Sequence, residues 1–312
     1  MGKNKKIIIV AGPTASGKSD FAIEIATRIG GVIINADSVQ LYKDIPILSA
    51  QPSKSMLSKI PHRLYSVLES YEATSVGGYQ MQAVQVINEI HNQEKIPIIV
   101  GGTGLYIKSI IEGLSNIPEI DNDTRSKIRD LFANIGNEEF YKILTEKDPV
   151  MASKLNIGDS HRLIRAMEVI QATGKSLDYW HNLPIKKPFE NAKIFTLVLM
   201  PERSMLYEKC NLRFQQMIEF GAIEEVKNLL NKNFSNHITK AIGVNQIIKY
   251  LKGEIELNNA IEEGKTLTRQ YAKRQFTWFN NQLSNSYKAI YQNIQDLYKD
   301  KSIKEVINSF IE

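Results

Sequence analysis

The feature that most constrains this chain is a glycine-rich segment, residues 12–19, between a predicted strand and a predicted helix. Residues 7–10 are a short run of β-branched apolar side chains, typical of a strand buried in a parallel sheet. Residues 20–28 carry apolar side chains at helical spacing. The segment between them reads GPTASGKS and fits the pattern G-x-x-x-x-G-K-[ST]. The sequence therefore predicts an α/β fold with a phosphate-binding loop after its first strand.

The residue types in this loop suit a polyphosphate. Its glycines let the backbone turn so that several N–H groups point inward, and the following helix adds partial positive charge at its N-terminus. Lys18 supplies a full charge, and Ser19 supplies a hydroxyl suited to Mg²⁺. Nucleotide kinases, NTPases and diphosphate-using transferases can all employ such a loop. We expect the phosphate to contact Gly12, Pro13, Thr14, Ala15, Ser16, Gly17, Lys18 and Ser19.

Two further predicted strands end in polar residues. Residues 31–36 lead to Asp37, and residues 96–100 lead to a glycine-rich turn that contains Thr103. Ligands of open parallel sheets bind beyond the carboxyl ends of the strands, so both residues are expected near the phosphate loop. Asp37 could instead cap the next turn. The glycines around Thr103 suit close approach of a ligand, or simply a turn into a helix.

The pattern then divides the chain. Residues 44–62 read as irregular, and residues 121–182 are charged and helical in pattern, without a strand-like run. A strand returns at 193–200, and from Arg203 the pattern is helical almost to the end. We expect a P-loop-type parallel sheet flanked by helices, with an all-helical insertion domain at 121–182. The catalytic core would comprise residues 1–120 and 183–312, with a helical C-terminal part.

One helical stretch is strongly basic. Residues 265–275 contain four basic side chains and no acidic one, and aromatic residues interleave with them and follow them. Such a helix can grip a nucleic-acid backbone, but a solvated face over an aromatic core fits equally well. In the insertion, Arg162 and Arg165 are three apart and share a helix face.

Composition excludes several classes of protein. The chain has 312 residues, and 39 basic side chains are largely offset by 34 acidic ones, so an anionic partner is permitted without being required. Its single cysteine, Cys210, excludes a disulfide framework and a cysteine metal site. The five histidines lack paired spacing, so no zinc site is expected. No segment approaches the length of a membrane span, and we expect a cytoplasmic protein.

Taken together, these segments resemble the tRNA dimethylallyltransferase family, also called tRNA isopentenyltransferases. The pairing of Asp-Ser-x-Gln after the second strand with Gly-Gly-Thr-Gly-Leu-Tyr after the third is distinctive. The matching blocks run in family order over almost the whole chain: GPTASGKS (12–19), NADSVQLY (35–42), IPHRL (60–64), PIIVGGTGLYI (97–107), DPVMASKL (148–155), HRLIRAMEVIQATG (161–174), RFQQMIEFGAIEEV (213–226), AIG (241–243) and YAKRQFTWF (271–279).

The resemblance implies transfer of a dimethylallyl group from dimethylallyl diphosphate to N6 of the adenosine just 3′ of the anticodon. The tRNAs would be those that read codons beginning with U. It implies that Asp37 accepts the proton, that Thr103 contacts the reacting adenine and the RNA backbone, and that Arg213 binds the departing diphosphate. Mg²⁺ would assist at Ser19. The expected partners are the anticodon arm and the donor, with a monomer as the expected state.

The resemblance also implies which residues hold the RNA. Position 51, usually lysine in the family, is Gln51 here, and Ser49 stands where threonine is usual, so a phosphate contact at 51 is in doubt. No zinc-finger extension follows Gln275, as in the bacterial form. The implied RNA contacts are Asp37, Ser38, Val39, Gln40, Thr103, Arg125, His161, Arg162, Leu163, Ile164, Arg165, Lys240, Gly243, Gln270, Tyr271, Lys273, Arg274 and Gln275.

Two other functions fit parts of the pattern. A small-molecule or nucleotide kinase would use the same loop to bind ATP, with Asp37 activating a hydroxyl. A non-catalytic RNA-binding NTPase would explain the basic helix, but it would leave Asp37 and Thr103 without a task.

Overall fold

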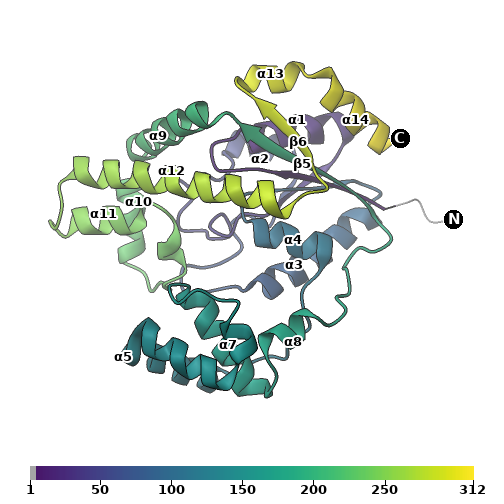
Figure 1. Cartoon of the computed structure of the whole chain (residues 1–312). Coiled ribbons are helices and arrows are strands. Elements are labelled where there is room, and N and C mark those ends of the chain that lie inside the picture. The colour runs from purple at the N-terminus through teal and green to yellow at the C-terminus, as the bar shows by residue number, and fades with distance from the viewer. Residues whose placement is uncertain (1–4) are drawn as a thin grey trace. The chain divides into compact units, whose positions relative to one another are not determined.

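A six-stranded parallel sheet forms the centre of the protein in this computed structural model, which describes residues 5–312 (Figure 1). The strands lie in the order β3-β2-β4-β1-β5-β6, and every pair is parallel. This is the P-loop-type α/β fold that the sequence predicts. The strands are β1 (Lys6–Ala11), β2 (Val32–Asn35), β3 (His62–Arg63), β4 (Pro97–Gly101), β5 (Lys193–Pro201) and β6 (Tyr287–Tyr291).

The phosphate loop leaves the sheet at its middle. Strand β1 lies between β4 and β5, with Val10 paired to Val100 on one side and to Leu197 on the other. Its side chains alternate between two apolar cores: Ile7 and Ile9 face one, and Ile8 and Val10 face the other. Burial on both faces explains the continuous apolar run at 7–10.

Helices cover both faces of the sheet. One core packs β1 against α3, α4 and α10–α12, and the other packs it against α1, α13 and α14. The helices of this part of the chain are α1 (Lys18–Ile29), α2 (Lys54–Lys59), α3 (Val76–Asn92), α4 (Gly104–Glu112), α9 (Arg203–Glu219), α10 (Ala222–Leu230), a 3₁₀ turn η1 (Ile238–Lys240), α11 (Val244–Leu251), α12 (Leu257–Gln282), α13 (Ile294–Lys299) and α14 (Lys301–Ile311).

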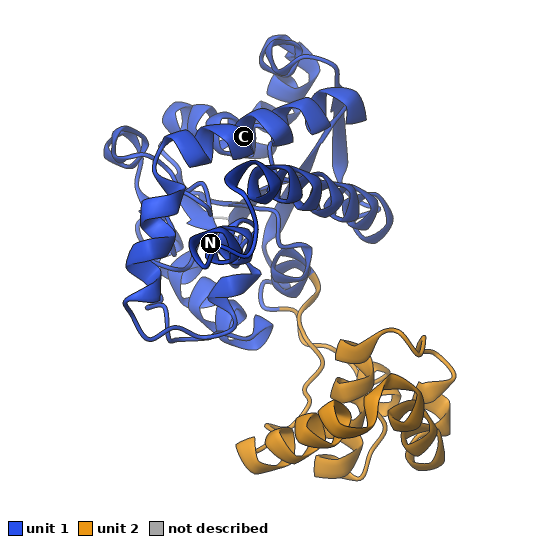
Figure 2. Ribbon diagram, turned by 90° about the vertical axis from the view of Figure 1, so that its left-hand side faces the viewer, with its two compact units in different colours: residues 1–111, 188–312 blue, residues 112–187 orange. Residues whose placement is uncertain are grey.

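The described chain separates into two compact units (Figure 2). Unit 1 holds the sheet and comprises residues 1–111 and 188–312, and unit 2 comprises residues 112–187. Unit 2 is all-helical, and it has a core of its own around Phe140, Leu144 and Leu163. The predicted insertion, 121–182, lies inside its bounds. Its helices are α5 (Asn122–Lys147), α6 (Pro149–Ala152), α7 (Ser160–Thr173) and α8 (Leu177–His181).

Local signals explain how the helices of unit 2 begin and end. Asp121 accepts the Thr124 N–H at the start of α5, and Asp148 accepts the Met151 N–H at the start of α6. Helix α7 ends at Gly174, whose φ of 65° suits glycine. Helix α5 is interrupted at Gly136, where the backbone leaves helical geometry.

Two sequence predictions about unit 1 are wrong. The segment 44–62 contains the short helix α2 and the start of strand β3, and the C-terminal part contains β6 as the edge strand of the sheet. Both strands are short and lie at sheet edges. Their stabilisation comes from pairing with β2 and β5, which a local apolar pattern does not reveal.

Candidate functional site

The phosphate loop is held in a tight turn by its own contacts. Gly12 and Gly17 have φ values of 149° and 79°, and a Cβ at Gly12 would lie 2.6 Å from the Leu199 carbonyl oxygen of β5. Both positions therefore require glycine. The Lys18 Nζ donates to the Pro13 carbonyl at 2.6 Å. Ser16 Oγ is buried without a hydrogen-bond partner, as expected of a loop shaped for a polar ligand.

Gln275 of α12 joins the phosphate loop to the glycine turn after β4. Its Oε1 accepts the Thr14 N–H at 2.8 Å, and its Nε2 donates to the Gly102 carbonyl at 2.8 Å. The side chain is 5% exposed, and its expected contact with RNA stays a prediction. A buried amide with both ends bonded to backbone instead fixes the distance between two loops.

The glycine turn makes room for a helix. A Cβ at Gly102 would lie 2.3 Å from Gln275 Nε2, and one at Gly104 would lie 2.3 Å from the Trp278 ring. Both contacts come from α12. The sequence suggested close approach of a ligand as one reason for these glycines. The structure shows another reason, because they let α12 pack directly on the turn.

Asp37 follows β2 and has a defined orientation. The Asp37 N–H donates to Asn35 Oδ1 at 2.8 Å, and Asp37 Oδ1 accepts the Val39 N–H at 3.2 Å. The neighbouring Ser38 N–H donates to Thr103 Oγ1 at 3.0 Å. The two strand ends predicted to meet, those of β2 and β4, are thus directly bonded.

Charged side chains concentrate around this point. Burial lowers the pKa of Lys18 to about 7, with Asp37 opposing and Arg213 reinforcing the shift. Burial raises the pKa of Asp37, while Lys18 and Arg213 oppose the rise. Arg213 Nη1 also donates to Thr14 Oγ1 at 3.2 Å. Asp37, Lys18 and Arg213 therefore interact across one site, and a raised pKa favours Asp37 as a proton acceptor.

A pocket of about 320 Å³ opens beside Asp37. Both polar and apolar residues line it. Burial raises the pKa of Tyr271, and the nearby charge of Asp37 raises it further, so the Tyr271 hydroxyl stays protonated. Of the predicted site residues, the lining includes Thr14, Asp37, Ser38, Val39, Arg213, Lys240, Tyr271 and Arg274, and it includes Ala241 and Ile242 from the region after Lys240 that the resemblance assigns to RNA binding. Residues that the sequence did not single out for the site are Leu48, Ser49, Phe214, Met217 and Thr268.

The segment at 45–51 forms one wall of this pocket. Gln51 donates from Nε2 to the Tyr42 carbonyl at 2.7 Å and accepts the Ser66 hydroxyl at 2.6 Å. Gln51 therefore links its own loop to Tyr42 and Ser66 by hydrogen bonds. Gln40 donates from Nε2 to the carbonyls of Ser49 and Ala50. The amide nitrogen of Gln40 is thus committed to this wall.

Helix α12 carries a second concave surface on its exposed side. The pocket measures about 550 Å³ and includes Trp278, with the exposed residues Gln270, Lys273 and Arg274 among its lining. Tyr271 and Gln275 lie on other sides of the helix, toward the first pocket and the loops. The basic helix therefore has a solvent-exposed basic surface and a packed inner face at once.

Gly243 belongs to unit 1, and the remaining residues expected to contact RNA lie in unit 2. His161 and Arg162 are exposed, and Ile164 and Arg165 are half-buried. The side chain of Leu163 is 0% exposed and packs in the core of unit 2, which leaves its backbone for the expected RNA contact. The buried Glu168 ion-pairs with Arg165 at 3.7 Å and with Arg129 at 3.4 Å.

Arg125 lies close to Arg165. Burial lowers the pKa of Arg165, and the charge of Arg125 lowers it further. Its Nε is buried without a hydrogen-bond partner. Unit 2 thus holds two arginines paired with Glu168 and a third, Arg125, near Arg165, and guanidinium groups suit phosphates. Arg129 was missed by the sequence reasoning, although it lies four residues after Arg125 on one helix.

The residues at the loop suit Mg²⁺ only together with a phosphate ligand. Among residues 5–312, no group of three or more His, Cys, Asp or Glu side chains could hold a metal ion by itself. Ser19 is half-buried at the start of α1 and offers a single oxygen. Magnesium commonly binds through one or two protein oxygens with phosphate and water completing its shell.

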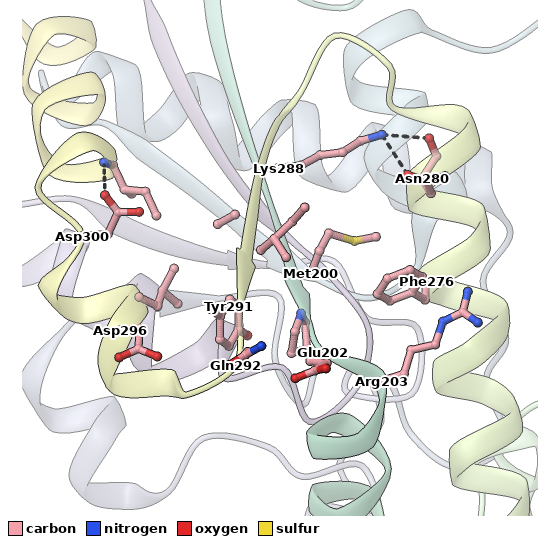
Figure 3. A pocket seen from close by; sticks show the side chains of 15 residues that line it. Met200, Glu202, Arg203, Phe276, Asn280, Lys288, Tyr291, Gln292, Asp296 and Asp300 are labelled. Carbon is pink, nitrogen blue, oxygen red and sulfur yellow. Dashed lines mark hydrogen bonds between the residues drawn. The ribbon is translucent and has the colours of Figure 1, made fainter.

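A third pocket, of about 650 Å³, lies across the edge strand β6 (Figure 3). Three of its charged side chains already have protein partners. Lys288 donates to Asn280, Asp300 accepts from the first turn of α14, and the Arg203 guanidinium lies over the Phe276 ring. None of the residues predicted for the site lines it.

The pocket is nevertheless connected to the phosphate loop from behind. The Tyr291 hydroxyl donates to the Ser16 carbonyl, and a Cβ at Gly17 would lie 2.5 Å from Ile294. The C-terminal segment therefore supports the loop.

Among the described residues, no helix has the length and apolarity needed to cross a membrane.

A family model and curated relatives of this chain point to the same family. A family model described as IPP transferase matches residues 40–282. A tRNA dimethylallyltransferase of Wolbachia pipientis is 47% identical over 283 residues, which cover 90% of this chain and 94% of that protein. A tRNA dimethylallyltransferase of Rickettsia conorii is 42% identical over 298 residues, 94% of this chain and 82% of the relative.

Solved structures give the same fold. A eukaryotic dimethylallyltransferase, studied crystallographically while acting on tRNA, aligns with a TM-score of 0.84 and 28% identity. The alignment covers 98% of this chain and 79% of that one. The full-length tRNA isopentenylpyrophosphate transferase of Bacillus halodurans aligns with a TM-score of 0.69 and 31% identity, over 99% and 97% of the two chains.

Proposed function

Because this chain belongs to the IPP transferase family of tRNA dimethylallyltransferases, we propose that it prenylates tRNA at the adenosine just 3′ of the anticodon. The donor is dimethylallyl diphosphate, and the acceptor atom is N6. The tRNAs are those that read codons beginning with U. These substrates belong to the cytoplasm.

One observation carries this proposal. Residues that can bind a diphosphate, Thr14 and Arg213, line the same pocket as a carboxylate with a raised pKa, Asp37. A transfer from a diphosphate to a weakly basic amine needs both elements. The leaving group requires charge neutralisation, and the amine must lose a proton as its new bond forms.

On the donor side, the phosphate loop receives the diphosphate. Binding replaces the internal bonds from Lys18 Nζ to Pro13 and from Arg213 to Thr14 with bonds to phosphate oxygens. These groups stabilise the negative charge that develops as the bond between C1 and oxygen breaks. Mg²⁺, held by Ser19 and phosphate oxygens, would supply further charge neutralisation.

On the acceptor side, Asp37 takes the proton from N6. The bond between N6 and C1 forms, the diphosphate departs with the electron pair of the broken bond, and the carboxyl group holds the proton. The ordered contact between Thr103 and Ser38 keeps the Asp37 segment in register with the turn after β4. N6 lies within the base stack of the anticodon loop, so the base must be extruded into the pocket.

The basic surface of α12 and the arginines of unit 2 would hold the RNA backbone. Lys273 and Arg274 are exposed on α12, Arg165 pairs with Glu168, and Arg125 lies near Arg165. Contacts to phosphates position a nucleic acid without reading its sequence. Selection of the adenosine is therefore assigned to the pocket beside Asp37.

The test is a transfer assay with labelled dimethylallyl diphosphate, Mg²⁺ and unmodified tRNA. The proposal predicts label on tRNA that carries adenosine next to the anticodon, and none when guanosine replaces that adenosine. Folded protein that transfers no label to the adenosine-containing tRNA would contradict the proposal. Transfer of the γ-phosphate of labelled ATP to a small acceptor would then identify a kinase.

A further inference from the structure

A buried carboxylate outside the proposed reaction centre holds one wall of the acceptor pocket. Glu225 of α10 is 8% exposed. Its Oε1 accepts the Ile47 N–H at 2.6 Å, and its Oε2 accepts the Leu48 N–H at 2.9 Å. Both carboxylate oxygens are thus bonded to consecutive backbone groups of a loop more than 170 residues away in sequence.

These two N–H groups belong to a helical turn at residues 45–50. The Ser49 N–H donates to the Ile45 carbonyl at 3.0 Å, and the Ala50 N–H donates to the Ile47 carbonyl at 2.9 Å. Ile47 and Leu48 lie in the first part of this turn. The first N–H groups of a helical turn require an outside acceptor, and the carboxylate of Glu225 serves as that cap.

The turn is directly part of the pocket. Leu48 and Ser49 line it together with Asp37. Leu48 also packs closely on Gly243, where a Cβ would lie 2.6 Å from Leu48 Cδ2. A shift of the turn would therefore move the wall that faces Asp37.

Position 225 requires two acceptor oxygens for a physical reason. A carboxylate can accept two N–H bonds, whereas an amide at the same place can accept only through its oxygen and would set its NH₂ against the other N–H. Glutamine at this position thus breaks one bond and adds a repulsive contact, while it keeps the size of the side chain.

We propose that Glu225 is a positioning residue for the acceptor half of the site. It fixes the turn at 45–50 so that Leu48 and Ser49 form the wall against which the extruded base rests. The identity of the base rests on the proposed function. The carboxylate acts only through the turn, and the diphosphate side, formed by the phosphate loop and Arg213, is independent of it.

The test compares Glu225→Gln with Glu224→Gln. Glu224 is the neighbouring residue on α10 and forms a surface ion pair with Lys227, so it controls for the loss of one charge from this helix. The first readout is amide hydrogen exchange at Ile47 and Leu48. At pH 8, above the pKa of about 7 to which burial raises Glu225, Glu225→Gln should accelerate exchange there about 10- to 100-fold, the usual effect of losing a charge-assisted hydrogen bond, and Glu224→Gln should not.

The second readout is steady-state kinetics with an anticodon stem-loop as acceptor. Glu225→Gln should raise the acceptor KM on the order of tenfold, because the wall that faces the bound base shifts, while binding of inorganic pyrophosphate stays unchanged. Unaltered exchange at both amides would overturn the clamp. Altered exchange with an unchanged acceptor KM, or an equal loss of pyrophosphate binding, would overturn the positioning role.

A variant and a control keep the test decisive. If Glu225→Gln does not fold, Glu225→Asp keeps the charge but withdraws it by one methylene, and it should produce the same pattern with smaller effects. If the wild-type protein transfers nothing, the proposed function fails, and the exchange measurement still decides whether Glu225 holds the turn.

Discussion

At the scale of single residues, two cations bond to polar groups of the phosphate loop itself. Lys18 bonds to the Pro13 carbonyl, and Arg213 bonds to the Thr14 hydroxyl. Both cations can turn to a diphosphate without a change in the backbone. The sequence predicted Lys18 at the loop from local spacing, whereas the family resemblance alone brought Arg213 there.

Lys18→Ala should reduce turnover by about 10²–10³, the effect of removing one group that stabilises charge in the transition state. Turnover is measured under saturating tRNA and donor, with Lys59→Ala on the surface of α2 as the control. A loss confined to tRNA affinity would contradict this assignment.

Glu225 predicts a specific dependence of stability on pH. Burial raises its pKa from 4.5 to about 7 in the folded protein, and the two backbone hydrogen bonds only partly oppose the shift. Between these values the folded protein holds a proton that the unfolded chain releases. Rising pH therefore favours unfolding, by about 3 kcal/mol in total across the window.

The measurement is the free energy of unfolding in urea between pH 4.5 and pH 8. The difference between the wild type and Glu225→Gln should shift in favour of the variant as the pH rises through the window. Glu224→Gln should follow the wild type. Parallel curves for the wild type and Glu225→Gln would show that the carboxyl titrates normally.

Glu225 and Gln275 also show where sequence reasoning ends. Glu225 lies between Ala222 and Leu229 on the buried stripe of α10, and this spacing was the one signal that could have singled it out. Gln275 reads as one more polar residue of a basic helix. Its bonds reach 261 and 173 residues along the chain, and only the fold brings those partners together.

At the scale of elements, α12 joins functions that the sequence treats separately. Its inner face packs Gln275 and Trp278 onto the turn after β4, and its outer face exposes Lys273 and Arg274. The sequence left a nucleic-acid surface and a packed aromatic face as alternatives for this segment. The structure gives the helix both a packed face and an exposed basic face, and Arg274 and Trp278 lie where the two faces meet.

The outer face of α12 predicts a salt effect. Lys273→Ala should weaken tRNA binding and lower the magnitude of the slope of log K against log salt concentration by about one, because one phosphate contact is lost. Lys301→Ala, on the helix α14 that packs over the other face of the sheet, is the control. Equal slopes for Lys273→Ala and the wild type would leave α12 without a role in RNA binding.

Strands with continuous apolar runs were predicted, and strands at the sheet edge were not. Strands β1, β2, β4 and β5 are buried on both faces over most of their length, and this burial requires the continuous apolar runs in their sequences. Strand β6 reads YKAIY, with Ile290 82% exposed and only Ala289 and Tyr291 buried. Its strand conformation depends on pairing with β5, a contact between segments about 90 residues apart.

At the scale of the whole molecule, two units with separate cores share one chain. The core of unit 2 contains Phe140, and a core of unit 1 contains Phe279, each 0% exposed. The chain passes between the units twice, near residues 111 and 188. Each unit can therefore lose stability without the same loss in the other.

Phe140→Ala should destabilise unit 2 by about 3–5 kcal/mol, the usual cost of truncating a buried phenylalanine. Hydrogen exchange should accelerate in α5 and α7 and remain slow in β1 and β4. Phe279→Ala is the matched variant and should reverse the pattern. Equal acceleration throughout residues 5–312 by both variants would show that the units unfold as one.

The most direct test of the proposed chemistry is the single-turnover rate of Asp37→Ala on a preformed complex with tRNA and labelled dimethylallyl diphosphate. With Asp37 as the base, the rate of transfer should fall by about 10²–10⁴ while both substrates still bind. A rate equal to that of the wild type would remove Asp37 from the proton transfer and contradict the mechanism built around it.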